Sequence, residues 1–189
     1  MTTVRRRAMY LLAAIAITAV PACSSTDSAA APSTTPSSST VPTAPIGGLT
    51  ISGAVPHPVT LTADQLRGYP VQTQVVTFDS SKGKQSHTYQ GAAVADLIND
   101  AHPVVDRAAK NPELRLALVA SGSDGYQAVL AWAEFSRDFA AKPILIAYTE
   151  DGQSLPKPRL VVPGDIKGGR YVSDLTDLRI VDLGITPAK

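Results

Sequence analysis

Cysteine is almost absent from this sequence, because its 189 residues include only Cys23. One cysteine excludes a disulfide within the chain, and it excludes zinc ribbons and iron–sulfur clusters, which need several thiolates. A strong net charge is also lacking, since 17 basic residues stand against 16 acidic ones. Three of the basic residues and one acidic residue lie within positions 1–45, which leaves 14 and 15 in the remainder. We therefore expect no nucleic-acid binding driven by counterion release.

What is present begins with the pattern of an export signal. Arg5–Arg7 precede an apolar run of about 15 residues, which is shorter than the roughly 20 needed to span a bilayer. The run ends in Val20-Pro21-Ala22-Cys23, which resembles the lipobox of bacterial lipoproteins, where the cysteine becomes the lipid-modified first residue. Ordinary secretory cleavage near Ala22 is the alternative. We predict a signal peptide over residues 1–22 and a lipid anchor on Cys23, with acyl chains such as palmitate holding the protein on the extracytoplasmic face of the cell membrane.

The next segment has the composition of a tether. From Ser24 to Pro45, 20 of 22 residues are Ser, Thr, Ala or Pro. Such a segment buries too little apolar surface to offset the entropy lost on ordering. We predict a disordered tether over residues 23–45. Residues 46–189 are then a single domain, long enough to fold without a disulfide or a structural metal.

Hydrophobic patterns in this domain predict more strands than helices. We expect strands over 49–55, 72–78, 86–89, 114–120, 126–130, 143–148, 159–162 and 178–183. Helices are expected over 60–67, 92–101 and 132–135, the first with Thr62 and Gln65 spaced as in a capping box. The polar segment Asp79–Lys84 is expected to be a long hairpin loop. The fold class is therefore α+β, rich in sheet.

Six short motifs follow one another along the domain. They are Gly53 with Val55, Pro58 and Leu61-Thr62; Tyr89-Gln90-Gly91 before Leu97-Ile98; Ser123-Asp124-Gly125-Tyr126; Leu145-Ile146-Ala147-Tyr148; Asp151-Gly152 with Leu155-Pro156; and Arg159-Leu160-Val161-Val162-Pro163-Gly164. Taken in this order over nearly the whole domain, they resemble the oxidoreductase molybdopterin-binding domain family, of the sulfite oxidase type. The resemblance implies a sulfite-oxidase-like molybdopterin-binding fold.

The sequence departs from that family at the metal ligand. Catalytic members hold molybdenum through a cysteine thiolate shortly before the aromatic-x-Gly turn. Here that stretch is Val76-Thr77-Phe78-Asp79-Ser80-Ser81, in which Asp79 lies closest to the vacant place. Catalytic members tend to carry two lysines after the segment equivalent to Arg159–Gly164. Here Ser173-Asp174 stands where the second lysine would be expected. An oxygen ligand does not forbid the metal, but the sulfite oxidase mechanism is removed.

In the family, the segments equivalent to the loop after Phe78, the Asp124 turn, Arg159 and the 164–170 loop surround the cofactor. The resemblance therefore implies one cleft with the cofactor-binding candidates Asp79, Ser80, Asp124, Tyr126, Arg159, Lys167, Gly168 and Arg170. The two arginines would give it a positive potential suited to a small anionic or pterin-like ligand. Molybdopterin itself is implied by the resemblance only. The residues indicate no catalytic group and no metal ligand, and the histidines are interpreted as surface residues.

Two functions remain open. The first, which we favour, is a non-catalytic module that binds a ligand or a partner. The second is a molybdopterin-dependent oxidoreductase with an oxygen ligand from Asp79 or Ser80. A protein loaded with cofactor in the cytoplasm is exported folded, by the twin-arginine route. Arg6-Arg7 before Ala8-Met9-Tyr10 fits that route loosely, and three adjacent arginines fit an ordinary signal as well.

Overall fold

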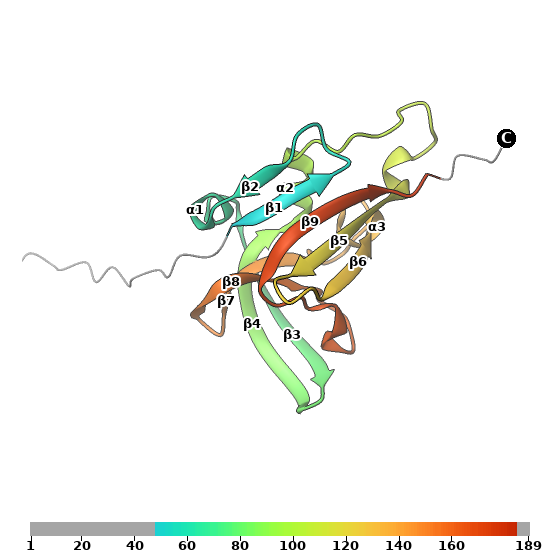
Figure 1. Cartoon of the computed structure of the whole chain (residues 1–189). Coiled ribbons are helices and arrows are strands. Elements are labelled where there is room, and N and C mark those ends of the chain that lie inside the picture. Colours follow the sequence, from blue (N-terminus) through green and yellow to red (C-terminus); the bar gives the residue numbers. More distant parts are fainter. Residues whose placement is uncertain (1–47, 185–189) are drawn as a thin grey trace, which may run out of the picture. The chain divides into compact units, whose positions relative to one another are not determined.

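The computed structural model describes residues 48–184 (Figure 1). The predicted signal peptide, Cys23 and the tether lie outside these residues. Within the described range, nine strands form two sheets. The first has the order β2-β1-β9-β5-β6, and its strands are β1 (Leu49–Gly53), β2 (Val59–Leu61), β5 (Leu116–Gly122), β6 (Gln127–Ala131) and β9 (Leu175–Asp182). Its neighbours pair antiparallel except β1 and β9, which are parallel.

The second sheet is antiparallel throughout and has the order β3-β4-β7-β8. Its strands are β3 (Val71–Ser80), β4 (Gly83–Ala93), β7 (Leu145–Glu150) and β8 (Gln153–Val161). The helices are short: α1 (Ala63–Arg67), α2 (Val94–Asp100) and α3 (Trp132–Phe135), with the 3-10 turns η1 (Pro112–Arg115) and η2 (Gly168–Arg170). In residues 48–184, no helix has the length and hydrophobicity required to cross a bilayer.

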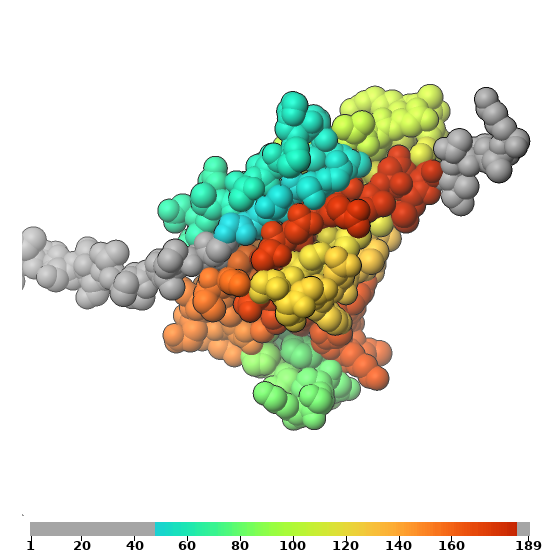
Figure 2. Space-filling view, in the orientation of Figure 1, coloured from blue at the N-terminus to red at the C-terminus, as the bar shows by residue number. Residues whose placement is uncertain are grey.

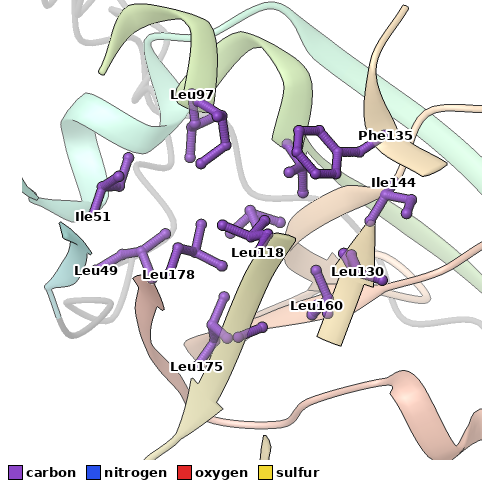
Figure 3. Close-up of a cluster of buried hydrophobic side chains, with 14 of the residues drawn as sticks. Leu49, Ile51, Leu97, Leu118, Leu130, Phe135, Ile144, Leu160, Leu175 and Leu178 are labelled. Atoms are coloured by element: carbon purple, nitrogen blue, oxygen red, sulfur yellow. The ribbon is translucent and has the colours of Figure 1, made fainter. Parts of the chain in front are cut away.

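The main hydrophobic core joins the five-stranded sheet, α2 and α3. Figure 3 shows Leu97 of α2 and Phe135 of α3 above side chains from β1, β5 and β9. Leu118 and Leu178 are about 1% and 0% exposed, so the central strands of the first sheet bury their inner faces completely. A smaller cluster includes Val76 and Tyr89 of the β3–β4 hairpin. The described residues thus form one α+β domain that is rich in sheet, and the predicted fold class is confirmed.

Short-range sequence patterns predicted the positions of the helices closely. Thr62 is the N-cap of α1, and it exchanges hydrogen bonds with Gln65 as a capping box. The third helix begins and ends at the predicted residues. The loop predicted over Asp79–Lys84 is wrong, however. Both strands continue through it, with Asp79 opposite Lys84, and only Ser81 and Lys82 make the turn.

Two strands were also misjudged. The chain pairs Val59–Leu61 with β1, where a helix start was expected. The eighth strand begins at Gln153, six residues before the predicted start, in spite of two prolines. Proline is tolerated there because β8 is an edge strand, whose outward N–H groups need no partner in the sheet.

Candidate functional site

A cleft of about 450 Å³ lies where the end of β3 meets the segment between β8 and β9. The Asp79 N–H donates to the Ile166 carbonyl over 2.8 Å, and Asp79 pairs with Lys167 as an isolated parallel bridge. Figure 1 shows the segment after β8 beside β3. Seven residues line the cleft: Phe78, Asp79, Ser80, Ser81, Lys167, Gly168 and Gly169. Four of them are predicted site residues, so the structure brings Asp79, Ser80, Lys167 and Gly168 together.

The apolar wall of this cleft is Phe78. Its ring lies 4.7 Å from the ring of Tyr171, between centroids. A Cβ at position 168 would stand 2.7 Å from atoms of the Phe78 ring. Real Cβ contacts are not that short, so Gly168 is needed for η2 to close on the aromatic side chain.

The polar groups of the cleft are of both signs. The Asp79 carboxylate and the Lys167 ammonium have no hydrogen-bond or ion-pair partner among residues 48–184. Ser80 is engaged, because its hydroxyl accepts the Lys82 N–H over 3.1 Å and donates to the Gly83 carbonyl over 3.0 Å. The cleft therefore offers one carboxylate, one ammonium group and an aromatic edge.

The Asp124 turn reaches the edge of the cleft through one residue. The Tyr126 hydroxyl donates to the Gly169 carbonyl, which joins the β5–β6 connection to η2. Asp124 does not line the cleft. Its carboxylate accepts the Tyr126 N–H over 2.9 Å, and Gly125 follows with a φ of 83°. These are the features of a structural turn.

Arg159 lies in a separate ion-pair network. Its guanidinium donates to Glu150 over 2.7 Å, to the Tyr89 hydroxyl over 3.1 Å and to Ser173 over 3.0 Å. Tyr89 is 0% exposed and donates to Glu150 over 3.0 Å. Burial raises the pKa of Tyr89 to about 12, against the lowering effect of Arg159. The expectation that Arg159 lines the cleft is therefore corrected, because its donors are taken by groups of the chain.

Arg170 forms a second and different network. Its guanidinium makes two bonds to Asp165, at 2.6 and 2.9 Å, and one of 2.5 Å to Glu134. The hydrogen bonds to Asp165 raise the pKa of Arg170 further above its usual range. It lines a neighbouring cavity of about 350 Å³ with both carboxylates. The expectation that Arg159 and Arg170 are free and line one cleft is therefore wrong. Each guanidinium is paired with carboxylates, and the two pairs lie in different places.

Sequence reasoning missed a cluster around His87. Its Nδ1 lies 2.7 Å from an oxygen of Asp151 and 3.3 Å from one of Glu150. Asp151 also accepts the Thr88 N–H over 2.8 Å, and that bond, followed by the bond to His87, lowers its pKa. The only available signal was strand alternation, which places His87 and Tyr89 on one face.

The described residues thus form a sheet-rich α+β domain with a cleft at the end of a strand and at the Gly-rich turn beside it. The chain matches the model of the oxidoreductase molybdopterin binding domain over residues 47–183. It therefore belongs to that family, as the sequence motifs predicted.

A solved structure shows the same fold. The chain is similar to the sulfane dehydrogenase SoxCD from Paracoccus pantotrophus, with 21% identity and a TM-score of 0.57. The match covers 71% of this chain and 38% of that one, so this chain spans well under half of that protein's length. The sulfite-oxidase-like fold is confirmed. A comparison with curated proteins gave no match.

The residues of the cleft do not fit a molybdenum cofactor held in the manner of the family's catalytic members. Residues 48–184 contain no sulfur ligand, because the one cysteine of the chain is Cys23. The two arginines that the resemblance implied for an anionic cofactor are bound to carboxylates.

Proposed function

We propose that this chain is an exported lipoprotein, anchored through Cys23, whose domain binds a small ligand without redox turnover. The observation that carries the proposal is the cleft at the end of β3. It is lined by four of the residues that the family resemblance assigns to the cofactor, among them Asp79, which lies closest in sequence to the place of the thiolate in catalytic members. A metal tuned by soft sulfur loses that ligand, whereas a binding site does not depend on it.

The lining favours a small flat ligand with hydrogen-bond donors. Phe78 supplies an apolar surface, and the unpartnered Asp79 carboxylate is an acceptor for ring N–H groups. Lys167 supplies one positive charge for an anionic substituent. Gly169 has open space where a Cβ would stand, which lets a ligand approach its backbone closely. A pterin-like compound has these features.

Binding is tested with a fluorescent pterin. Titration of the purified chain should quench the fluorescence to saturation at one site. Asp79→Asn and Lys167→Ala should each weaken the binding by on the order of tenfold, the effect of one charged hydrogen bond. Lys110→Ala, which lies outside the cleft, is the matched control. Equal affinity in all four proteins would remove the cleft from the proposal.

Redox function is tested on protein purified from its native host. We expect no stoichiometric molybdenum by elemental analysis, and no sulfite oxidation or sulfoxide reduction. The alternative function, an oxidoreductase with an oxygen ligand, is favoured by one observation, the unpartnered carboxylate of Asp79 in the cleft. About one molybdenum per chain, lost in Asp79→Ala, would establish that alternative.

A further inference from the structure

Three side chains outside the cleft converge at the end of β7. His87 comes from β4, Glu150 is the last residue of β7, and Asp151 begins the turn to β8. One ligand atom of each lies within 4.8 Å of the other two, and residues 48–184 contain no other such group of His, Cys, Asp or Glu. None of the three lines the cleft beside Phe78. We call these three residues the His87 cluster.

Backbone pairing largely fixes the His87 cluster. Strand β7 pairs with β4 so that Glu150 lies opposite Tyr89. The Asp151 N–H donates to the Thr88 carbonyl over 2.8 Å, and the Thr88 N–H donates to the Asp151 carboxylate over the same distance. Figure 2 shows the β7–β8 region, in orange, at the surface next to the green β3–β4 hairpin. The cluster is therefore held in place at a position that solvent can reach.

Each carboxylate of the cluster binds the protein through one oxygen and directs the other to His87. Asp151 accepts the Thr88 N–H with Oδ1, while its Oδ2 lies 2.7 Å from Nδ1 of His87. Glu150 accepts Arg159 with Oε2 over 2.7 Å, while its Oε1 lies 3.3 Å from the same Nδ1. Outer groups that orient ligands in this way are the usual support of a metal site. One nitrogen and two oxygens thus lie around a common point.

The spacing of these three atoms is close to that around zinc. Zinc binds nitrogen and oxygen at about 2.0 to 2.2 Å, which puts tetrahedral ligands roughly 3.4 Å apart. The distance of 3.3 Å between His87 Nδ1 and Glu150 Oε1 agrees with this value. The 2.7 Å to Asp151 is that of a hydrogen bond, whose proton the ion would replace as the gap widens by roughly 0.7 Å. Glu150 Oε1 also accepts the Tyr89 hydroxyl over 3.0 Å, and its second lone pair is left for the ion.

We propose that the His87 cluster binds a zinc ion through Nδ1 of His87, Oε1 of Glu150 and Oδ2 of Asp151, with water in the remaining positions. One imidazole and two carboxylates suit zinc, whereas magnesium and calcium are bound by oxygen ligands. With a neutral imidazole, the two carboxylates and Arg159 leave these four side chains with one net negative charge, which favours a cation. The bound ion ties β4 to the β7–β8 turn, and so stabilises the folded chain.

Titration of the purified full chain, without a histidine tag, tests this site with zinc alone. Competition against a chromogenic zinc indicator should show one zinc per chain, and excess magnesium should not displace it. Asp151→Asn keeps an acceptor for the Thr88 N–H but loses the anionic ligand, and His87→Ala loses the nitrogen. Each substitution should weaken zinc binding by more than about tenfold, since loss of an outer group alone commonly costs that much. Zinc should also raise the melting temperature of the wild type and not that of either variant.

The matched controls are His57→Ala and Asp138→Asn, which lie outside the cluster and should bind zinc as the wild type does. Cys23→Ala should also bind it equally, which excludes the thiol as the ligand. A melting curve without zinc shows whether each variant folds, and Asp151→Asn decides if His87→Ala does not. The proposal is overturned if the wild type binds no zinc, if the cluster variants bind as tightly as the controls, or if Cys23→Ala loses the ion.

Discussion

Asp151 ties the β7–β8 turn to strand β4. It stands in the turn with a φ of 50°, a conformation that Asp and Asn tolerate better than most residues. Its carboxylate accepts the Thr88 N–H and lies within hydrogen-bond distance of His87. Both bonds favour the ionised carboxylate, and they lower its pKa below the ordinary value of 3.8.

We expect Asp151→Asn to lower the stability at neutral pH, because asparagine keeps the turn but loses the charge. A carboxyl whose pKa is lowered by folding stabilises above its unfolded value, and this stabilisation disappears as the pH falls through the folded pKa. The melting temperatures of the two proteins should therefore converge below pH 3.8. Asp138→Asn is the control, since that carboxylate accepts no hydrogen bond in the described residues. A difference that persists to pH 2 would contradict the assignment.

The candidate site shows which residue contacts a sequence can predict. Asp79, Ser80, Lys167 and Gly168 share a cleft, and this was predictable because the family resemblance placed the loop after Phe78 and the 164–170 loop around one site. The pairing of Arg159 with Glu150 could not be predicted from spacing, because it depends on the register of β7 against β8. Arg170 pairs instead with Asp165 of the same connection between β8 and β9 and with Glu134 of α3, so both arginines assigned to the ligand are used by the protein itself.

At the scale of elements, Gly91 allows β4 to approach β7. The register of this pair shifts between Gln90 and Gly91. A Cβ at position 91 would stand 2.2 Å from the Ile146 carbonyl oxygen and 2.6 Å from the Ala147 Cα. The glycine of the Tyr89-Gln90-Gly91 motif is thus explained by packing of two backbones, without a cofactor.

Gly91→Ala should therefore destabilise the domain by roughly 3 kcal/mol or more, because neither backbone can move away without breaking the ladder. Denaturant unfolding at neutral pH measures the change. Gly169→Ala serves as comparison, since a Cβ there meets nothing within 4 Å. If both substitutions cost the same, the close approach is not the reason for glycine at position 91.

Elements were predictable where the signal is local. The capping box of Thr62 and Gln65 and the apolar spacing of α2 depend on residues within one or two turns. The hairpin around Ser81 was misjudged because the strand ends next to the turn, residues 79–80 and 83–86, are polar on both faces, as a loop is. The short β2 has no pattern of its own and exists only through pairing with β1.

For the whole molecule, alkaline pH is expected to weaken the fold. Tyr69, Tyr89 and Tyr171 each have a pKa raised to about 12, in all three cases mainly by burial. A group with a raised pKa stabilises fully below its unfolded value, about 10, and the stabilisation is lost as the pH rises towards 12. Melting temperatures should fall across this range, together with a rise of tyrosinate absorbance at unfolding. A melting temperature that stays constant to pH 12 would refute this.

The attachment of the molecule to a membrane remains a prediction from Cys23. Cys23→Ala removes the proposed acyl chains, and within residues 48–184 no helix is long and apolar enough to cross a bilayer. We expect the variant to move from the membrane fraction to the soluble or secreted fraction, as measured by fractionation and immunoblotting. Unchanged membrane association of the variant would show that the lipobox interpretation is wrong.

The central strand of the five-stranded sheet is also the last strand of the domain. Since β9 lies between β1 and β5, neither neighbour can complete its pairing until residues 175–182 have left the ribosome. The five-stranded sheet therefore cannot be completed during synthesis. Pairing β1 with β9 also brings together the two ends of the domain, and contacts so far apart in the sequence slow folding. If the chain is exported as proposed, an unfinished sheet of this kind is compatible with threading through a secretion channel, which requires an unfolded chain.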